Sequence, residues 1–525
     1  MLDCAFLSGT SRPSPGLLSS AMNSDTAELA IVDPASELAV PFEPRASHRW
    51  APAVALGAAG RLLAGPRALD SARVTAVRDS WRALWSSRAL VWVTAVGTLL
   101  AFGFGPVRNT FNPPGLTRGF GWLGDLLAAP AARWDAAWYL AIAHYGYRPD
   151  LGAFTASRTA FFPLYPLGLR TIAWSGIPPV LAGVLLSLLA LALALYGIHR
   201  LTTLELGDRG ALAFARGEGA ETARLAVMVT AFAPMAFFFS AVYSESLYLA
   251  LSVGLFWSAR HGRWALVGLL GALAGASRST GLVLALPALM IYLYGPREDR
   301  VADFAGQNLA PQREGDGAWP RARAFARSSL GRLRPRYRVR RDLLWLGLLP
   351  AGIVAYGASL ALSGGDPLAP LHAQDVWGRH FAGPYVGAWD GLRAAVDGAR
   401  QLLSVQRHHV YFPLAPGDPF VSAEHNLMLL VFLVIAIPAV VGVVRMLPLA
   451  YGAYVIAALA LPLSYPVSAQ PLMSLPRFLV VLFPLNIWLA AWLAARPRAR
   501  LPTLALSAAL MAVFAAQFAT WHWVA

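Results

Sequence analysis

Residues 264–294 read WALVGLLGALAGASRSTGLVLALPALMIYLY, and this segment sets the membrane topology of the chain. It is too long for one crossing of about 20 apolar residues and too short for two full ones. Its polar break, Ala276–Gly281, contains Arg278. The loop that follows, residues 295–342, carries twelve arginines against six acids, which is typical of a cytoplasmic loop. We therefore expect two short helices that meet at an outward-facing turn around Arg278.

The composition is that of a polytopic helical membrane protein. Of the 525 residues, 57% are hydrophobic and 14% are charged, and the mean hydropathy is +0.51. A soluble chain of this length would be more charged. The net charge of +15 comes from arginine, because the chain has no lysine, and it lies mainly in loops between apolar runs. The positive-inside rule explains this charge without a nucleic-acid partner. The single cysteine, Cys4, excludes an internal disulfide and a cysteine-based metal site.

Apolar runs and arginine-rich loops predict an all-α protein with about eleven transmembrane helices in the cell membrane, the N-terminus cytoplasmic and the C-terminus outside. Residues 1–88 are expected to form a partly disordered cytoplasmic tail that ends in a surface helix. Residues 89–521 are expected to form the transmembrane domain, with two large outward loops, 106–177 and 364–425. The expected spans are 89–104, 178–198, 226–241, 242–259, the two halves of 264–294, 343–362, 427–447, 449–464, 478–495 and 502–521.

The outward side gathers the polar residues that could act on a substrate. Ionisable groups in or near membrane spans are costly, so they are functional candidates by default. The segment Arg133–Tyr147 places one acid, Asp135, among aromatic and basic residues, and Ala160–Pro166 follows it. An acid for a hydroxyl proton, aromatic planes for a sugar ring and a cation for phosphate are what a sugar-phosphate site needs. The candidates are Asp135, Arg133, Trp134, Trp138, Tyr139, His144, Tyr147, Tyr165, Tyr243, Glu245, Arg278, Gln374, Trp377, Arg379, His380 and Arg477.

Each group of candidates has a purely structural alternative. Tryptophan and tyrosine also gather where an amphipathic helix lies at the headgroup level, and His144 could serve there as a hydrogen-bonding residue. Glu245 could cap a helix that begins beside it. Arg278 or Arg477 could be an anchor whose charge reaches the membrane surface. The neighbouring His408 and His409 point apart and have no carboxylate at a matching spacing, so we expect no metal site.

Six motifs follow one another along the chain. They are Arg133-Trp-Asp-Ala-Ala-Trp-Tyr-Leu140, Ala160-Phe-Phe-Pro-Leu-Tyr-Pro166, Tyr243-Ser-Glu-Ser-Leu-Tyr248, Ser277-Arg-Ser-Thr-Gly281, Gln374 with Trp377-Gly-Arg379, and Pro476-Arg-Phe478. In this order they resemble the PIG-V-type mannosyltransferases, the family of the second mannosyltransferase of GPI-anchor assembly. The resemblance covers residues 89–495. Because an arginine-only basic composition indicates GC-rich coding, we expect a bacterial member with another acceptor.

The resemblance implies a fold similar to that of the GT-C glycosyltransferases and a polyprenyl-phosphate sugar as the donor, with no cofactor and no metal. It implies transfer of mannose on the outer side of the membrane with inversion, to a glycan, glycolipid or protein acceptor. Asp135 takes the place of the base in the first outer loop. Arg278, Arg379 and Arg477 are then suited to the donor phosphate, since guanidinium groups grip phosphate in a bidentate manner.

Three other functions remain open at this point. The donor could be another prenyl-phosphate sugar, such as glucose or arabinofuranose. A transporter or flippase would instead use Asp135 and Arg278 as binding charges, but it predicts symmetric halves, and the sequence has no convincing internal repeat. A non-catalytic scaffold would leave Asp135 replaceable. A nucleotide-sugar enzyme is not indicated, because no glycine-rich phosphate loop follows an expected strand.

Overall fold

The computed structural model of the chain describes residues 71–106, 109–148, 157–206, 219–303, 335–408, 410–412 and 417–524. Over these residues the fold is helical, with two isolated β-bridges, Pro114 to Arg118 and Arg379 to Val467. The first half contains α2 (Ser71–Phe102), η1 (Asn109–Phe111), α3 (Gly121–Ala128), α4 (Ala136–Tyr145), η2 (Arg158–Ala160), α5 (Leu164–Ala173), α6 (Pro179–Leu206), α7 (Gly219–Ala231), η3 (Ala236–Ser240) and α8 (Glu245–Arg260).

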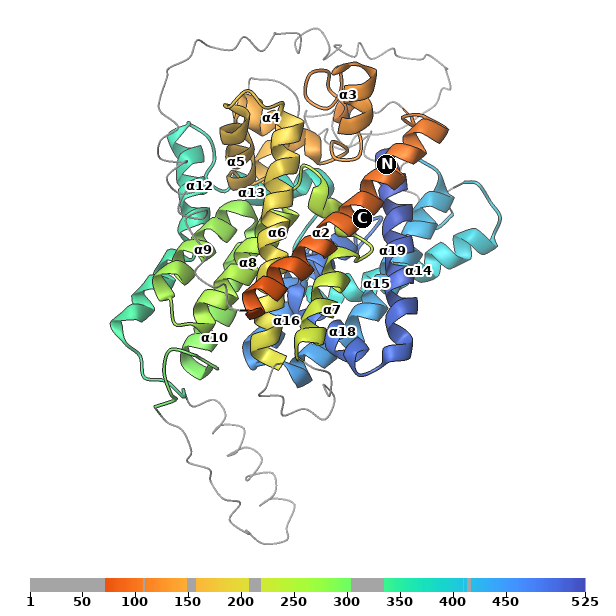
Figure 1. Cartoon of the computed structure of the whole chain (residues 1–525). Helices are drawn as coiled ribbons and strands as arrows, with labels where there is room; N and C mark the ends of the chain where they lie inside the picture. The colour runs from red at the N-terminus through yellow and green to blue at the C-terminus, as the bar shows by residue number, and fades with distance from the viewer. Residues whose placement is uncertain are drawn as a thin grey trace, which may run out of the picture.

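The second half continues with the interrupted helical segment and the helices that follow it (Figure 1). Its elements are α9 (Trp264–Ser277), η4 (Ser279–Leu284), α10 (Ala285–Tyr294), η5 (Arg341–Leu348), α12 (Ala351–Leu362), α13 (Ala369–His372), η6 (Ala373–Trp377), α14 (Pro384–Leu403), α15 (Pro419–Met446), α16 (Leu449–Leu463), α17 (Leu475–Val480), α18 (Phe483–Ala494) and α19 (Pro497–Ala519).

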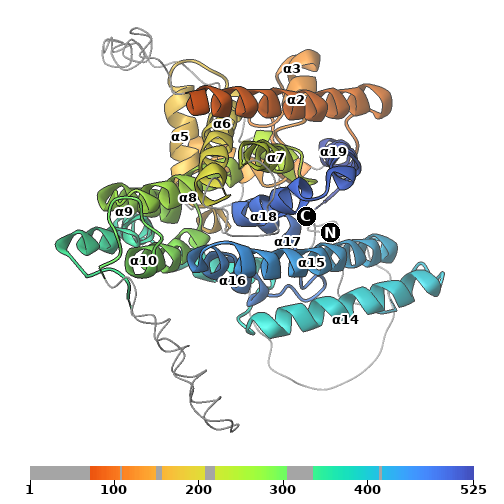
Figure 2. The ribbon, with the colours of Figure 1, turned by 60° about the horizontal axis from the view of Figure 1, so that its bottom comes forward.

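The helices are arranged in layers. Figure 2 shows α2 along one face and α14 along the opposite face, with α8, α17 and α18 between them. The long helix α6 packs against both α7 and α8, and α18 packs against α7. The buried side chains between these helices are mostly apolar and form one continuous hydrophobic core.

Eleven full-length spans are not confirmed. Four helices in the described part are long and apolar enough to cross a membrane, namely α2, α6, α15 and α19. The pair η5 and α12, bent by 42°, makes a fifth if it is one span. The other expected spans are helices of 10–17 residues, shorter than the roughly 20 residues that a full crossing needs. The several apolar helices nevertheless fit a membrane protein.

Proline explains one of the interruptions. The expected span 226–241 is helical in α7 only to Ala231, and the chain resumes as η3 after Pro234, which cannot donate an intrahelical hydrogen bond. The side chain of Arg88 fills the gap. Its Nη1 donates to the Ala236 carbonyl at 2.7 Å and its Nη2 to the Ala231 carbonyl at 2.9 Å. The buried guanidinium thus satisfies backbone groups that the break leaves unpaired.

The expected boundary at residue 88 falls inside a helix. Helix α2 is continuous from Ser71 to Phe102, because residues 71–96 contain neither proline nor glycine. The expected surface helix and the expected first span are therefore one element. The rest of the expected N-terminal tail, and most of the basic loop 295–342, lie outside the described residues.

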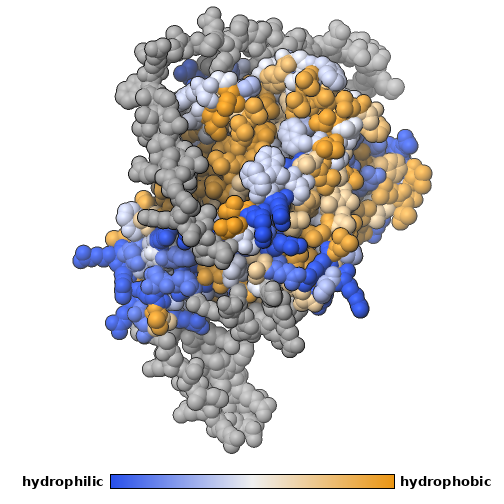
Figure 3. All heavy atoms as spheres, in the orientation of Figure 1, coloured by the Kyte–Doolittle hydropathy of each residue, from blue (hydrophilic) through white to orange (hydrophobic). Residues whose placement is uncertain are grey.

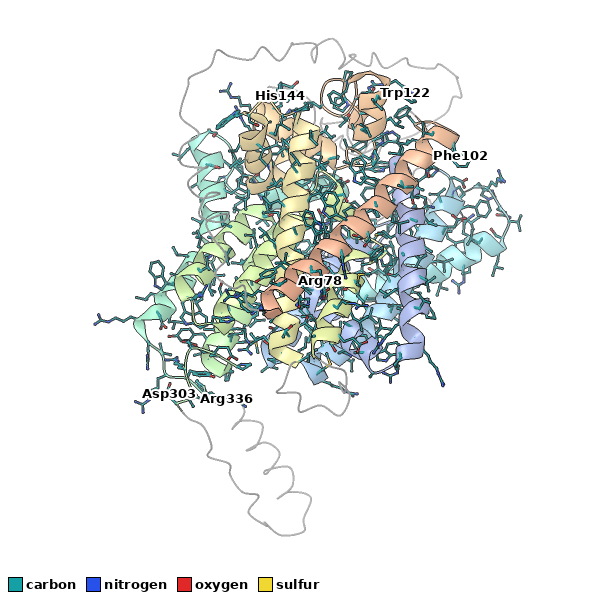
Figure 4. All side chains as sticks on the ribbon, in the orientation of Figure 1. Arg78, Phe102, Trp122, His144, Asp303 and Arg336 are labelled. Carbon is teal, nitrogen blue, oxygen red and sulfur yellow. The ribbon has the colours of Figure 1, made fainter. Side chains whose placement is uncertain are left out.

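The two loops that were expected to face outward meet each other. The Thr159 hydroxyl of the first loop donates to the Ala369 carbonyl of the second at 3.3 Å. Beside this contact, the Tyr356 hydroxyl of α12 donates to the Thr159 carbonyl at 2.9 Å. Trp377 lies 6.1 Å from Phe161, centroid to centroid. Figure 4 shows His144 of the first outer loop at the opposite end of the molecule from Asp303 and Arg336, which belong to the described ends of the basic loop 295–342. This part of the first outer loop and the described ends of the basic loop therefore lie at opposite ends of the molecule.

Candidate active site

Four charged side chains from remote segments form a continuous chain of ion pairs. Nη1 of Arg477 lies 2.6 Å from Oδ2 of Asp135, and Nε of Arg477 lies 3.3 Å from Oε1 of Glu245. Nη1 of Arg278 lies 2.9 Å from the same Glu245 oxygen. The four residues come from the start of α4, the start of α8, the turn after α9, and α17. These groups were expected on one side of the membrane, and in the structure they are in contact.

The backbone around Asp135 is held by Tyr243. The Tyr243 hydroxyl accepts a hydrogen bond from the Asp135 N–H at 3.0 Å and donates one to the Arg133 carbonyl at 3.0 Å. Between these two residues, Trp134 has φ +52°, a left-handed conformation that non-glycine residues rarely adopt. A strained backbone conformation of this kind persists only where surrounding contacts hold it in place. Tyr243 therefore positions the carboxylate through the main chain.

Glu245 is an internal counterion and does not cap its helix. It is the first residue of α8, yet the N-terminus of that helix has no side-chain cap. Its side chain is 1% exposed, whereas that of Asp135 is 15% exposed. One Glu245 oxygen faces two guanidinium groups, and a buried carboxylate needs such partners. Of the two carboxylates, Asp135 is the one that a substrate can reach.

The interrupted segment places Arg278 as expected. Helix α9 ends at Ser277, and Arg278 is extended, with φ −157° and ψ 150°, before η4 begins. Gly281 lets the chain fold back, because a Cβ there would lie 2.2 Å from the carbonyl carbon of Ala274. The two short helices on either side of a break at Arg278 are confirmed, while the outward direction of the turn stays a prediction.

Arg379 stands beside the ion pairs without joining them. Its backbone pairs with Val467 in an antiparallel bridge. Its buried Nε makes no hydrogen bond within the part of the chain that the structure describes. Burial, together with the nearby positive charge of Arg477, lowers the pKa of Arg379 to about 10, although Asp135 acts to raise it. A buried guanidinium with a free donor beside a second guanidinium is suited to an anion.

The cluster carries one surplus positive charge. Arg278, Arg379 and Arg477 contribute three cations, and Asp135 and Glu245 contribute two anions. Among the described residues, no group of three His, Cys, Asp or Glu side chains is placed to hold a metal ion.

Most of the predicted aromatic residues build the walls of this region. Trp138 stacks on Phe161, 5.1 Å between ring centroids and 15° between planes, and is 1% exposed. The Tyr139 hydroxyl is 2.8 Å from that of Ser244, and the buried Tyr165 hydroxyl donates to the Gly183 carbonyl at 2.9 Å. Trp377 is partly buried and lies 6.2 Å from Trp138.

The structure does not bring some predicted residues to the carboxylates. Arg133 donates from Nε to the Ala519 carbonyl at 3.0 Å, and its guanidinium lies 4.5 Å from the centre of the Trp521 ring. The Trp134 ring also packs against Trp521, at 5.6 Å. These contacts fix the loop that carries Asp135 onto the end of α19.

The remaining predicted residues lie at the edges of the two loops. His144 is exposed near the end of α4. The Tyr147 hydroxyl donates to the Phe161 carbonyl at 2.6 Å. Gln374 is partly buried in η6, and His380 is exposed.

Two features escaped sequence reasoning. The first is that Asp135 pairs with Arg477, although Arg133 is only two residues away. Nothing local to either residue indicates that pairing. The second is Tyr356, which joins α12 to the first outer loop; a tyrosine within an otherwise apolar span was the available signal.

Comparison with known proteins bears on this site directly. Residues 120–293 match the family described as mannosyltransferase (PIG-V). The match contains Asp135, Tyr243, Glu245 and Arg278, while Arg379 and Arg477 lie beyond it. No curated protein and no solved structure matches the chain.

A helical membrane fold with this site and this match defines a glycosyltransferase. Within it, residues 120–293 are similar to the PIG-V mannosyltransferases, as the motifs in the sequence indicated.

Proposed function

We propose that the protein transfers mannose from a polyprenyl-phosphate carrier to an acceptor on the outer face of the membrane, with inversion at the anomeric carbon. The observation that carries this proposal is the ion-pair chain Asp135–Arg477–Glu245–Arg278 with Arg379 beside it. It supplies an accessible carboxylate and three guanidinium groups in one place. The match to a mannosyltransferase family supports mannose as the sugar that is transferred.

The arginines suit the donor by charge and by geometry. A polyprenyl-phosphate sugar is a phosphodiester with one negative charge, which balances the one surplus positive charge of the cluster. The free Nε of Arg379 and the partly exposed Arg278 and Arg477 offer donors to its oxygens. As the sugar leaves, the phosphate gains a second negative charge, which the same cations stabilise.

Asp135 is suited to act as the general base. In the proposed step, the acceptor hydroxyl oxygen attacks the anomeric carbon while the bond from that carbon to the phosphate oxygen breaks. The hydroxyl proton passes to Asp135, and the electron pair of the broken bond stays on the phosphate. This is the role of the base carboxylate in inverting glycosidases. Glu245 cannot share the role because its side chain is 1% exposed.

The test is transfer of radiolabelled mannose from polyprenyl-phosphate mannose to endogenous membrane acceptors. Wild type is compared with Asp135→Asn at matched expression and with Asp390→Asn, a partly buried carboxylate in α14 outside the ion-pair chain. General bases contribute about 10²–10⁴-fold, so Asp135→Asn should lose at least 100-fold and Asp390→Asn should be unchanged.

Other outcomes change the proposal in defined ways. Equal transfer by wild type and by Asp135→Asn removes Asp135 as the base. Transfer from prenyl-phosphate glucose or arabinofuranose, with none from the mannose donor, keeps the reaction and changes the sugar. No transfer from any prenyl-phosphate sugar overturns the proposed donor class.

A further inference from the structure

A deep groove opens on a different part of the surface, between α2, α6, α8 and α9. It has a volume of about 1110 Å³. It follows α6 from Leu186 to Arg200, a length of about 20 Å at 1.5 Å per residue. Glu245 begins α8 at the ion-pair cluster, whereas Arg263 lies just beyond the other end of that helix. The far end of the groove is thus about 25 Å from the candidate active site.

The walls of the groove are apolar and uncovered. Leu189 and Leu193 of α6 are 61% and 60% exposed, and Val77 of α2 is 55% exposed. Ala250 and Leu270 line the opposite side. Exposed apolar surface of this kind on a membrane protein is a surface for hydrocarbon chains. Figure 3 shows hydrophobic residues over much of this face with a hydrophilic patch among them, and Figure 4 places Arg78 on the same face.

One end of the groove is strongly basic. Arg73 and Arg78 come from α2, Arg200 from α6, and Arg263 from the turn after α8. The described residues that line the groove include no acid. Two carboxylates beside the groove have other partners. That of Asp79 lies 3.7 Å from Arg78 but is 7% exposed and also lies 3.6 Å from His199. That of Asp299, next to Gly262, forms an ion pair with Arg297.

The aromatic residues at that end fit a membrane interface. Trp81 and Trp257 line the groove, and the guanidinium of Arg200 lies 5.6 Å from the centre of the Trp257 ring. Tryptophan favours the headgroup level, where one side of the ring is apolar and the other is wet. The groove therefore changes from hydrocarbon character to headgroup character along its length.

We propose that this groove is a binding site for an anionic glycerophospholipid. Its phosphate lies among Arg73, Arg78, Arg200 and Arg263, and an acyl chain lies along the leucines of α6. Basic pockets between membrane helices bind anionic headgroups in this way. A length of about 20 Å accommodates an acyl chain, since one leaflet of the hydrocarbon core is about 15 Å thick. The site is separate from the proposed donor site and does not depend on the transfer reaction.

The test measures the melting temperature of the delipidated full-length protein in detergent. Phosphatidylglycerol is added to one sample, phosphatidylcholine to a second and inorganic phosphate to a third. We expect phosphatidylglycerol to raise the melting temperature by several degrees, phosphatidylcholine by less than a third of that, and phosphate not at all. Native mass spectrometry counts the phosphatidylglycerol that stays bound.

Three variants locate the effect. Arg78→Gln combined with Arg200→Gln should lose at least half of the phosphatidylglycerol shift. Leu193→Trp keeps every arginine but obstructs the groove, so it should also lose at least half of the shift in melting temperature that phosphatidylglycerol causes. Arg498→Gln, an exposed arginine in the first turn of α19, should keep it. Equal shifts with both lipids, a shift with phosphate alone, or a full shift in the groove variants would overturn the proposal. If the double variant does not fold, the shift in melting temperature of Leu193→Trp with phosphatidylglycerol tests the proposal.

Discussion

Asp135 and Arg477 are separated by 342 residues in the sequence, yet Oδ2 of one lies 2.6 Å from Nη1 of the other. The side chains are 15% and 12% exposed, so the pair is largely removed from water. In such surroundings a lost partner leaves an uncompensated charge, which costs more than the pair itself contributes.

The Asp135–Arg477 ion pair predicts that one double variant regains stability without regaining activity. Arg477→Gln should lower the free energy of unfolding by about 3–5 kcal/mol, because Asp135 and Glu245 lose a shared cation. Combining it with Asp135→Asn should restore part of that stability without restoring mannose transfer. Thermal unfolding and transfer assays on the two single variants and the double variant measure this.

The control for that cycle is the exposed pair Asp397 and Arg400, 3.1 Å apart. Neutralising both should change stability by no more than about 1 kcal/mol and leave transfer intact. A double variant at Asp135 and Arg477 that is no more stable than Arg477→Gln would show that the two charges do not act as a pair.

Tyr243→Phe should impair the placement of Asp135. Loss of the hydroxyl leaves the Arg133 carbonyl and the Asp135 N–H without their partner, at a cost of about 1–3 kcal/mol. Because strain at Trp134 is then free to relax, kcat should fall by at least tenfold while KM for the donor changes little. Tyr165→Phe removes a buried hydroxyl bonded to Gly183 and should cost similar stability with a smaller effect on kcat. Equal kcat losses would count against a positioning role for Tyr243.

Gly281→Ala should distort the turn that presents Arg278. The new methyl group would meet the backbone of Ala274 at 2.2 Å, and backbone cannot move aside as a side chain can. We expect a loss of about 1–3 kcal/mol in stability together with weaker donor binding. Gly347→Ala is the matched change, since a Cβ there meets nothing within 4 Å. Unfolding curves and KM for the donor distinguish the two, and identical behaviour would remove the packing argument.

Arg379→Gln should weaken donor binding without weakening the fold. Burial lowers the pKa of Arg379 to about 10, so the folded chain holds this proton less tightly than the unfolded chain does. The charge therefore destabilises the fold at neutral pH, and this penalty fades as the pH rises through about 10. The variant should be at least as stable as wild type, with KM for the donor raised at least tenfold. Arg407→Gln, an exposed arginine of the same expected loop, should change neither quantity. A large loss of stability in Arg379→Gln would contradict this account.

The sequence alone was sufficient for the helical class, the interrupted segment at Arg278 and the gathering of charged residues at one place. Arginine distribution and apolar length carry that information, because the membrane imposes both. The sequence did not predict which side chains contact each other. Proximity in sequence suggested that Arg133 accompanies Asp135, but Arg133 reaches Ala519 instead. Side-chain direction depends on packing between remote helices, which no local pattern records.

Span counting failed for a related physical reason. An apolar run such as 226–241 has the composition of a membrane helix, but Pro234 interrupts it and the buried Arg88 compensates the break. A helix enclosed by protein can be short or broken, because its neighbours satisfy the backbone groups that lipid cannot. Hydropathy reports the environment of a segment and does not report whether the segment is continuous.

The anchoring of Arg133 and Trp134 on the end of α19 also sets an order of events during biosynthesis. The residues that flank Asp135 emerge from the ribosome early, whereas Ala519, to which Arg133 bonds, is made 386 residues later. Until α19 has been inserted, the loop has no surface on which to settle, and Arg477 is also still missing for most of that time. The nascent protein is therefore expected to stay inactive until α19 has been inserted, which would keep a partly assembled enzyme from consuming the proposed donor.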